Sequence, residues 1–170
     1  GPHARAALSA FSRESLARAV VLQRDPCGHA PLARVIRAGR AAGPLVGGNL
    51  ALLAALAGTP YAPRYDGAIL VLEDVGEATY RIDRMLRQLA LCGALGAIAG
   101  LACGAFTEGT PPHDVNSRPL DDVLREAADI AGVPAIAGIP MGHVDDQWTL
   151  PLGAHAELDA DSGTLHVTLP

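Results

Sequence analysis

The sequence contains no lysine, so all thirteen of its cationic residues are arginines, and eighteen acidic residues give a formal net charge of −5. The arginines are scattered and form no basic stripe, which excludes the electrostatic footprint of a nucleic-acid-binding domain. No run of 18 apolar residues could cross a bilayer as a helix. No charged start followed by an apolar run indicates a signal peptide. Neither nucleic acid nor a membrane is therefore expected as a partner.

Cysteine is scarce. The three cysteines, Cys27, Cys92 and Cys103, make an odd count with no C-x-x-C pair, which argues against a disulfide framework and favours a reducing compartment. Cys92 and Cys103 sit in apolar stretches and are predicted to be small core residues. Metal-ligand spacings such as H-E-x-x-H are missing as well, so a metal site is not expected.

What is present is the composition of a globular domain. The 170 residues are 49% hydrophobic and 18% charged, which suits one domain with a sizeable core. The chain starts with Gly1-Pro2 rather than with Met, which predicts that further residues precede Gly1 in the gene product.

Residues 1–43 differ in character from the rest and are predicted to be an inter-domain linker or a lead-in to the domain over 44–170. Within the linker, a helix is predicted over 12–23, capped by Ser12, with an apolar face that includes Leu16 and Val20.

The pattern over 44–170 predicts an α/β fold with a mixed sheet and a β-rich C-terminal end. Amphipathic spacing predicts helices over 50–57, 79–93 and 120–130, the first capped by Asn49. Continuous apolar runs predict buried strands over 68–72, 97–102 and 135–139. A polar loop is predicted over 111–119, and short segments within 149–169 indicate antiparallel β-structure.

Two residues are placed as active-site residues often are. Glu73 directly follows the predicted strand over 68–72, and His143 comes shortly after the strand over 135–139. Sites in open α/β sheets form beyond the carboxyl ends of the strands, where a carboxylate and an imidazole could act as the acid and base of a hydrolytic triad. Asp74 and Glu77 compete with Glu73, although either could simply favour the start of the next helix.

The remaining histidines have plainer interpretations. They fall in the linker, in the polar loop or at outward-facing strand positions: His3, His29, His113, His155 and His166.

A nucleophile is missing from this arrangement. None of the five serines lies in a G-x-S-x-G elbow or a comparable strand-to-helix turn: Ser9, Ser12, Ser15, Ser117 and Ser162. Cys103 has only apolar neighbours, which give no reason for an activated thiolate. An acid and a base without a nucleophile form an incomplete catalytic triad.

Three segments resemble a known family. GPLVGGNLALLAALAGTPY, ILVLEDVGEATYRIDRMLRQL and IPMGHVDDQWTLPLGAHAELD are together similar to the C-terminal domain of LD-carboxypeptidases, also called muramoyltetrapeptide carboxypeptidases. The likeness covers residues 43–169, and the three motifs stand in the family's order at compatible spacing.

The resemblance implies a swivelling β/β/α domain that supplies two members of a Ser–Glu–His triad. The family's glutamate falls on Glu73 and its histidine on His143, while the serine domain would lie upstream of Gly1. The implied reaction is release of terminal D-alanine from murein tetrapeptides in peptidoglycan recycling, without a cofactor or metal. Family members are typically cytoplasmic and often dimeric.

Because the serine domain is absent from this chain, the resemblance predicts an inactive catalytic half. Three alternatives stand beside it: a relative of the microcin immunity hydrolases, which cleave a peptidyl-nucleotide on the same scaffold; a noncatalytic binding or dimerisation module; and an unrelated α/β domain.

Overall fold

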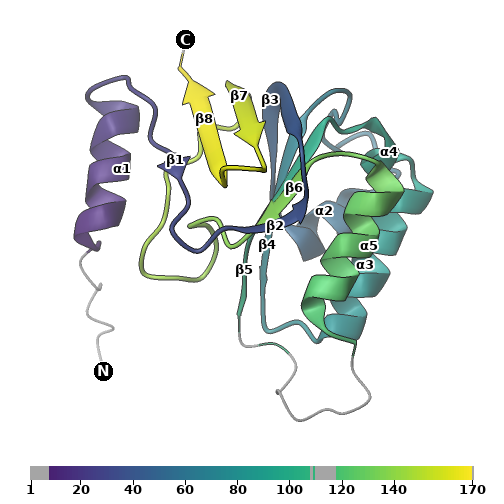
Figure 1. Ribbon diagram of the computed structural model, residues 1–170. Coiled ribbons are helices and arrows are strands. Elements are labelled where there is room, and N and C mark those ends of the chain that lie inside the picture. Colours follow the sequence, from purple (N-terminus) through teal and green to yellow (C-terminus); the bar gives the residue numbers. More distant parts are fainter. Residues whose placement is uncertain (1–7, 108, 110–117, 170) are drawn as a thin grey trace.

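A single eight-stranded mixed sheet organises the protein, and the strand order is β1-β8-β7-β3-β4-β5-β6-β2 (Figure 1). The computed structural model describes residues 8–107, 109 and 118–169. The helices are α1 (Ala10–Val20), α2 (Leu50–Leu56), α3 (Thr79–Leu91), α4 (Ala94–Ala97) and α5 (Leu120–Ala131). The strands are β1 (Gly28–His29), β2 (Arg34–Arg37), β3 (Arg40–Asn49), β4 (Ile69–Val75), β5 (Gly100–Thr107), β6 (Ala135–Ala137), β7 (His155–Asp159) and β8 (Thr164–Thr168). The predicted α/β class with a mixed sheet is confirmed.

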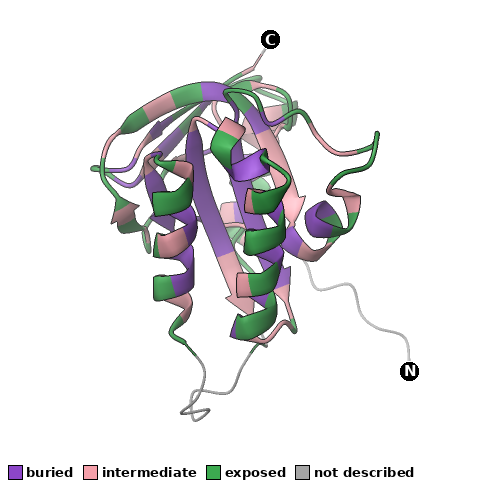
Figure 2. Ribbon diagram, turned by 90° about the vertical axis from the view of Figure 1, so that its right-hand side faces the viewer, coloured by how far each residue is buried: buried purple, intermediate pink, exposed green. Residues whose placement is uncertain are grey.

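Strands β3 to β6 form the parallel centre of the sheet, and helices α2 to α5 cover one of its faces (Figure 2). Side chains alternate between the two faces of a strand. Leu70 and Leu72 of β4 therefore pack with the helices, whereas Ile69 and Val71 face the opposite side. Both faces of β4 are buried, as expected for a continuous apolar run in a parallel sheet.

The second face of the parallel strands is covered by the antiparallel end of the same sheet. Residues 40–44 of β3 pair with β7, while residues 45–49 pair with β4, so β3 belongs to both parts. Leu158 and Val167, from β7 and β8, are buried in one apolar cluster with Ile69 and Val71. The sheet thus folds back over itself, with a core on each side of β4.

The predicted linker contributes regular structure. It holds α1, β1 and β2, and the boundary predicted at residue 43 falls inside β3. The predicted apolar face of α1 is wrong: Leu16 and Val20 are exposed, whereas Ser12 and Ser15 are buried. The residue that caps α1 is Ser9, not Ser12. Ser12 and Ser15 turn inward because their hydroxyls bond backbone groups of other segments.

Several boundaries also differ from those predicted. Strand β4 runs on to Val75, so Glu73 lies inside the strand rather than after it. Strand β5 starts at Gly100 because residues 94–97 form α4, and residues 149–152 form no strand. Most of the predicted polar loop lies outside the described residues. Helices α2, α3 and α5 lie where the apolar spacing predicts them.

The three thiols differ sharply in burial. Cys92, predicted to be a core residue, is exposed because α3 ends at Leu91 and the chain turns there, whereas Cys27 and Cys103 are buried. Burial raises the pKa of Cys103 to about 12. Burial, together with the nearby charge of Asp25, raises the pKa of Cys27 well above its ordinary value.

We therefore expect one thiol per native chain to react with a disulfide reagent at pH 8, because only the thiolate is nucleophilic. The reacting thiol should be Cys92, and all three should react in denaturant. Titration with the reagent before and after unfolding, with Cys92→Ser as the control, measures this. Reaction of Cys27 or Cys103 in the native chain would contradict the burial described above.

No helix among the described residues is both long and apolar enough to cross a membrane.

Candidate active site

Glu73 lies near the carboxyl end of β4, on the strand face shared with Ile69 and Val71. Only 8% of Glu73 is exposed, so its carboxylate needs hydrogen-bond donors to offset its desolvation. Two donors reach it: Asn49 Nδ2 lies 3.3 Å from Oε1, and His143 Nδ1 lies 3.1 Å from Oε2. The structure therefore brings the two predicted site residues into direct contact.

His143 sits in a loop that follows β6, here called the histidine loop (residues 140–149). Gly142 precedes it with φ +111, a conformation that side chains rarely adopt. A Cβ at Gly142 would lie 3.0 Å from Glu73 Oε2 and 3.2 Å from the Ala105 carbonyl oxygen. Glycine therefore lets the loop pack directly on β4, so that the next residue reaches the carboxylate.

The contact with Glu73 orients the imidazole. A carboxylate accepts a hydrogen bond from Nδ1–H, which leaves Nε2 with its lone pair in the neutral ring. The His143 side chain is 58% exposed, against 10% for that of Glu73. A buried carboxylate thus holds a ring whose other edge can meet a substrate, which is the arrangement of the base and its orienting acid in a hydrolytic triad.

Asn49 and Asp74 support Glu73 from the side of α2. Asn49 caps α2 by accepting a hydrogen bond from the Leu52 amide, and its Nδ2 also donates to Asp74 Oδ1 at 3.0 Å. Asp74 is buried and accepts hydrogen bonds from the amides of Ala51 and Val75. Asp74 therefore faces the helices, not His143, because it points to the opposite side of β4 from Glu73.

The site opens into a pocket of about 470 Å³. Its lining combines the polar pair with apolar side chains: Gly48, Glu73, Met141, Gly142, His143, Gln147, Trp148, Leu150 and Leu152. None of these residues is a serine, threonine or cysteine. Within the described parts of the chain, no group of three or more His, Cys, Asp or Glu residues could hold a metal ion.

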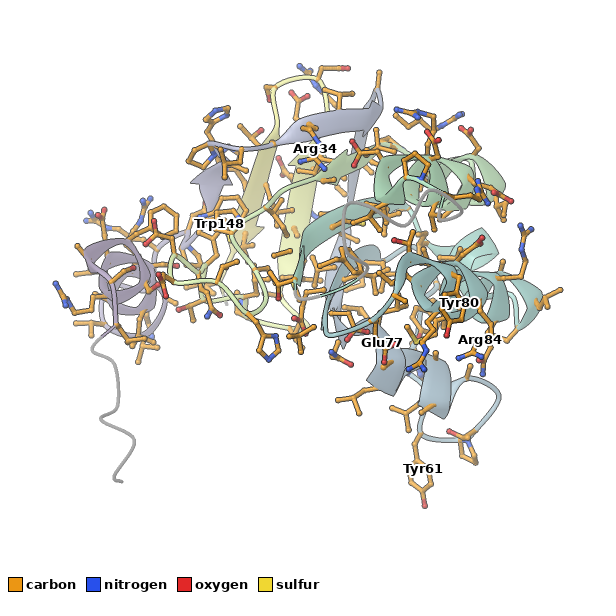
Figure 3. The ribbon with its side chains drawn as sticks, turned by 90° about the horizontal axis from the view of Figure 1, so that it is seen from below. Arg34, Tyr61, Glu77, Tyr80, Arg84 and Trp148 are labelled. Carbon is orange, nitrogen blue, oxygen red and sulfur yellow. The ribbon has the colours of Figure 1, made fainter. Side chains whose placement is uncertain are left out.

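Glu77, the other competing carboxylate, lies elsewhere. Its Oε2 is 3.5 Å from Arg81 Nη1. Figure 3 places it beside Tyr80 and Arg84 at the start of α3, well apart from Trp148 of the histidine loop. Glu77 therefore interacts with α3 and is not part of the Glu73–His143 site.

The described histidines outside the pocket are all exposed, namely His29, His155 and His166. His3 and His113 lie outside the described residues.

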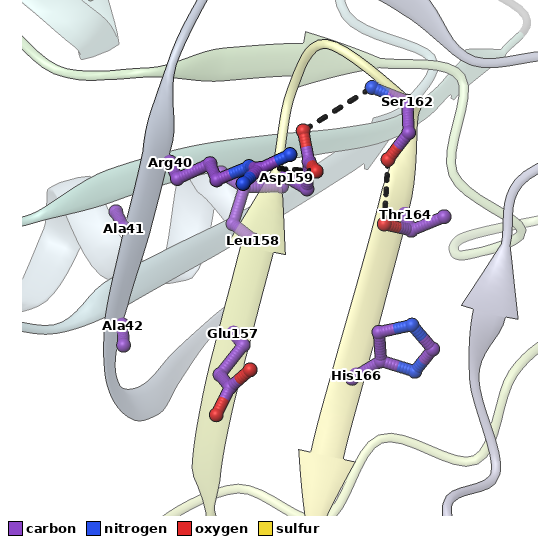
Figure 4. A pocket seen from close by; sticks show the side chains of 9 residues that line it. All are labelled: Arg40, Ala41, Ala42, Glu157, Leu158, Asp159, Ser162, Thr164 and His166. Carbon is purple, nitrogen blue, oxygen red and sulfur yellow. Dashed lines mark hydrogen bonds and ion pairs between the residues drawn. The ribbon is translucent and has the colours of Figure 1, made fainter.

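A larger concavity, of about 750 Å³, lies on the outer face of β3, β7 and β8 (Figure 4). His166 faces it, and its Nδ1 lies 2.8 Å from Asp25 Oδ2. This surface is away from the carboxyl ends of the parallel strands, where sites of α/β sheets form. Two pairs of its polar residues bond each other, Arg40 with Asp159 at 2.9 Å and Ser162 with Thr164 at 2.9 Å. The pocket at His143 is therefore the better candidate for chemistry.

Comparison with known proteins identifies the family. A family model described as the LD-carboxypeptidase C-terminal domain matches residues 42–158. The chain belongs to this family.

Relatives of this LD-carboxypeptidase domain carry carboxypeptidase names. A putative carboxypeptidase of Streptomyces coelicolor is 46% identical over 133 residues, covering 78% of this chain and 41% of the relative. A probable murein peptide carboxypeptidase of Bacillus subtilis is 39% identical over 126 residues, covering 74% and 40%. The crystal structure of a muramoyltetrapeptide carboxypeptidase from Oxalobacter formigenes superposes with a TM-score of 0.81 at 32% identity, covering 96% of this chain and 56% of that one.

A more distant relative is the microcin C7 self-immunity protein MccF of Escherichia coli, 28% identical over 131 residues, covering 76% of this chain and 38% of MccF. The LD-carboxypeptidase domain described here spans about two fifths of the length of the curated relatives it matches.

Sequence reasoning missed how the pair in this LD-carboxypeptidase domain is supported. Asn49 is predicted only as a helix cap, yet it also bridges Glu73 and Asp74. The structure supplies the reason: Asn49 ends β3, which lies parallel to β4, and pairs in register with Glu73, whereas the sequence predicts no strand there. The roles of Ser12 and Ser15 carried no sequence signal either, because their partners in the histidine loop lie more than a hundred residues away.

Proposed function

We propose that this chain is the C-terminal half of a serine LD-carboxypeptidase that releases terminal D-alanine from murein tetrapeptides in peptidoglycan recycling. The observation that carries the proposal is the 3.1 Å contact between His143 Nδ1 and the buried Glu73, on the wall of an open pocket. The murein names of the relatives support the substrate class.

In the proposed mechanism, His143 Nε2 takes the proton of a serine hydroxyl while the serine oxygen attacks the carbonyl before D-alanine. The imidazolium then gives that proton to the departing amine as the C–N bond breaks, and water releases the acyl group by the same steps. Glu73 fixes the ring tautomer and stabilises the imidazolium. No nucleophile lies among the described residues that line the pocket, so the serine is proposed to come from residues upstream of Gly1.

This division of the triad predicts that the chain alone is inactive. The experiment compares the 170-residue chain with the longer gene product, using a murein tetrapeptide and quantifying free D-alanine. Release is expected from the longer protein only. Release by the chain alone, with loss of activity in Glu73→Ala or His143→Ala, would show that the nucleophile lies within these residues and would sink the proposal.

The likeness to MccF favours one second candidate, hydrolysis of a peptidyl-nucleotide on the same scaffold. Testing the longer protein on an aminoacyl-sulfamoyl adenylate beside the murein tetrapeptide separates the two reactions by their ratio of kcat/KM. A noncatalytic binding or dimerisation module would turn over neither substrate.

The proposed enzyme is a cytoplasmic homodimer, as the family resemblance implies. Light scattering coupled to a sizing column measures the mass of the longer protein, and a monomer at micromolar concentration would contradict the dimer.

A further inference from the structure

Helix α1 is attached to the domain through the partly buried Phe11 and through two buried serines. It stands at the margin of the molecule, beside β1 and the histidine loop (Figures 1 and 3). Its large apolar residues Leu16 and Val20 are 40% and 67% exposed, whereas Ser12 and Ser15 are only 5% and 4% exposed. Small hydroxyl residues at the buried positions of a helix contribute little apolar area, so at Ser12 and Ser15 it is hydrogen bonds that dock α1, beside the apolar packing of Phe11.

Each of these serines bridges backbone groups of other segments. Ser12 Oγ donates to the Asp145 carbonyl at 2.9 Å and accepts from the Gln147 amide at 2.9 Å. Ser15 Oγ donates to the Pro26 carbonyl at 2.8 Å and accepts from the Thr149 amide at 2.8 Å. Three of the four partners belong to the histidine loop. We call Ser12 and Ser15, with these four bonds, the serine clasp.

The histidine loop depends on such outside partners. It forms no helix or strand, so its backbone groups lack the regular pairing of secondary structure. Its start is tied down by the Met141 carbonyl, which accepts from the Ala105 amide at 2.8 Å, and by the Trp148 amide, which donates to the Pro140 carbonyl at 2.7 Å. Beyond His143, the bonds that tie its backbone to α1 are those of the serine clasp.

We propose that Ser12 and Ser15 are positioning residues for His143, holding the histidine loop in the register that presents the imidazole to Glu73. The proposal rests on the proposed function only for the role given to His143. The clasp attaches two, four and six residues after His143, so its loss changes the path of the loop without removing any atom of the Glu73–His143 pair. When α1 detaches from the domain, the clasp breaks, and the histidine loop that carries His143 is then expected to move.

The test measures loop geometry in the 170-residue chain without relying on activity. Native-state hydrogen exchange follows the amides of Gln147 and Thr149, and ¹⁵N chemical shifts of the His143 ring report its tautomer. In Ser12→Ala the Gln147 amide should exchange roughly ten- to hundredfold faster, because its acceptor is gone. The Nδ1–H tautomer of His143 should lose population in the same variant. Ser15→Ala should act likewise on the Thr149 amide.

Ser162→Ala is the matched control. It removes an exposed hydroxyl that contacts Thr164 Oγ1 in the β7–β8 turn and should change neither readout. Ser12→Thr keeps the hydroxyl and should retain the wild-type tautomer population. If Ser12→Ala loosened the whole fold, the distant amides of β4 would also exchange faster in that variant. If any loss of a hydroxyl had this effect, Ser162→Ala would show it too.

The wild-type chain provides a second test if the variants fail to fold. A coupled unit requires the amides of Gln147 and Thr149 to exchange with the same opening free energy as the amides of α1. Protection of these two amides while α1 exchanges would overturn the proposal. So would an unchanged His143 tautomer population in folded Ser12→Ala and Ser15→Ala.

In the longer protein, Ser12→Ala should lower kcat roughly tenfold while KM changes less than threefold, as expected when only the geometry of the base is disturbed. If the longer protein shows no activity at all, the proposed function fails, whereas the exchange and tautomer results still decide the role of the clasp.

Discussion

Replacing His143 with alanine in the longer gene product should lower kcat for D-alanine release by about 10⁴-fold, with little change in KM. The imidazole is the only described group in the pocket that contacts the buried Glu73 while keeping a nitrogen on the accessible side. In the proposed mechanism, loss of the imidazole leaves the serine hydroxyl with no base to take its proton and the leaving amine with no acid. Single-turnover measurement of D-alanine release separates this chemical step from product release.

The matched control for this prediction is His166→Ala. His166 also pairs with a carboxylate, at 2.8 Å from Asp25 Oδ2, and its side chain is 59% exposed, against 58% for that of His143. It lies on the outer face of β8, so its loss should change kcat less than twofold. Equal losses in the two variants would mean that the His143 pair has no special role, and an unaffected His143→Ala would refute the proposed mechanism.

Replacing Gly47 with alanine should have the largest effect on stability, at about 4 kcal/mol or more in the free energy of unfolding, so that little native chain remains. A Cβ at Gly47 would lie 1.9 Å from the Val71 carbonyl oxygen. That oxygen is backbone of the adjacent strand, and Gly47 pairs in register with Val71. Relief of the clash would therefore require β3 and β4 to separate at the centre of the sheet.

Gly48→Ala is the control, one residue along the same strand. Gly48 has φ +140, close to the +146 of Gly47, but a Cβ there meets no atom within 4 Å. The backbone strain alone should cost about 1–3 kcal/mol. Urea unfolding of both variants, followed by circular dichroism, measures the difference, and similar free energies of unfolding would contradict the close approach of β3 to β4.

Much of the fold could be predicted because helices and strands follow from patterns between residues that are close in the sequence. The stripe through Ile82, Met85 and Leu89 predicts α3, and those side chains are buried against the sheet. Asn49 before an apolar helical stretch predicts the cap of α2, which the structure confirms. Position relative to strand ends made Glu73 and His143 candidates, since parallel strands bring their carboxyl ends to one edge, and the family resemblance chose Glu73 over Asp74 and Glu77.

The errors fall where contacts between distant segments decide the outcome. An apolar stripe over residues 12–23 predicts that Leu16 faces inward, yet α1 meets the polar backbone of the histidine loop and buries Ser12. Cys92 lies in an apolar stretch, yet the chain turns at the end of α3 and exposes it.

The sequence by itself determined the class of fold, the family resemblance and the two residues most suited to chemistry, because each follows from local periodicity, order along the chain or motif. Only the tertiary structure decided that Glu73 and His143 are in contact at 3.1 Å, that Asn49 ties Glu73 to Asp74, and that Ser12 reaches the Gln147 amide. The physical reason is that periodicity reports how exposed each position is on average. A hydrogen bond between segments 135 residues apart depends instead on how separate elements pack against one another.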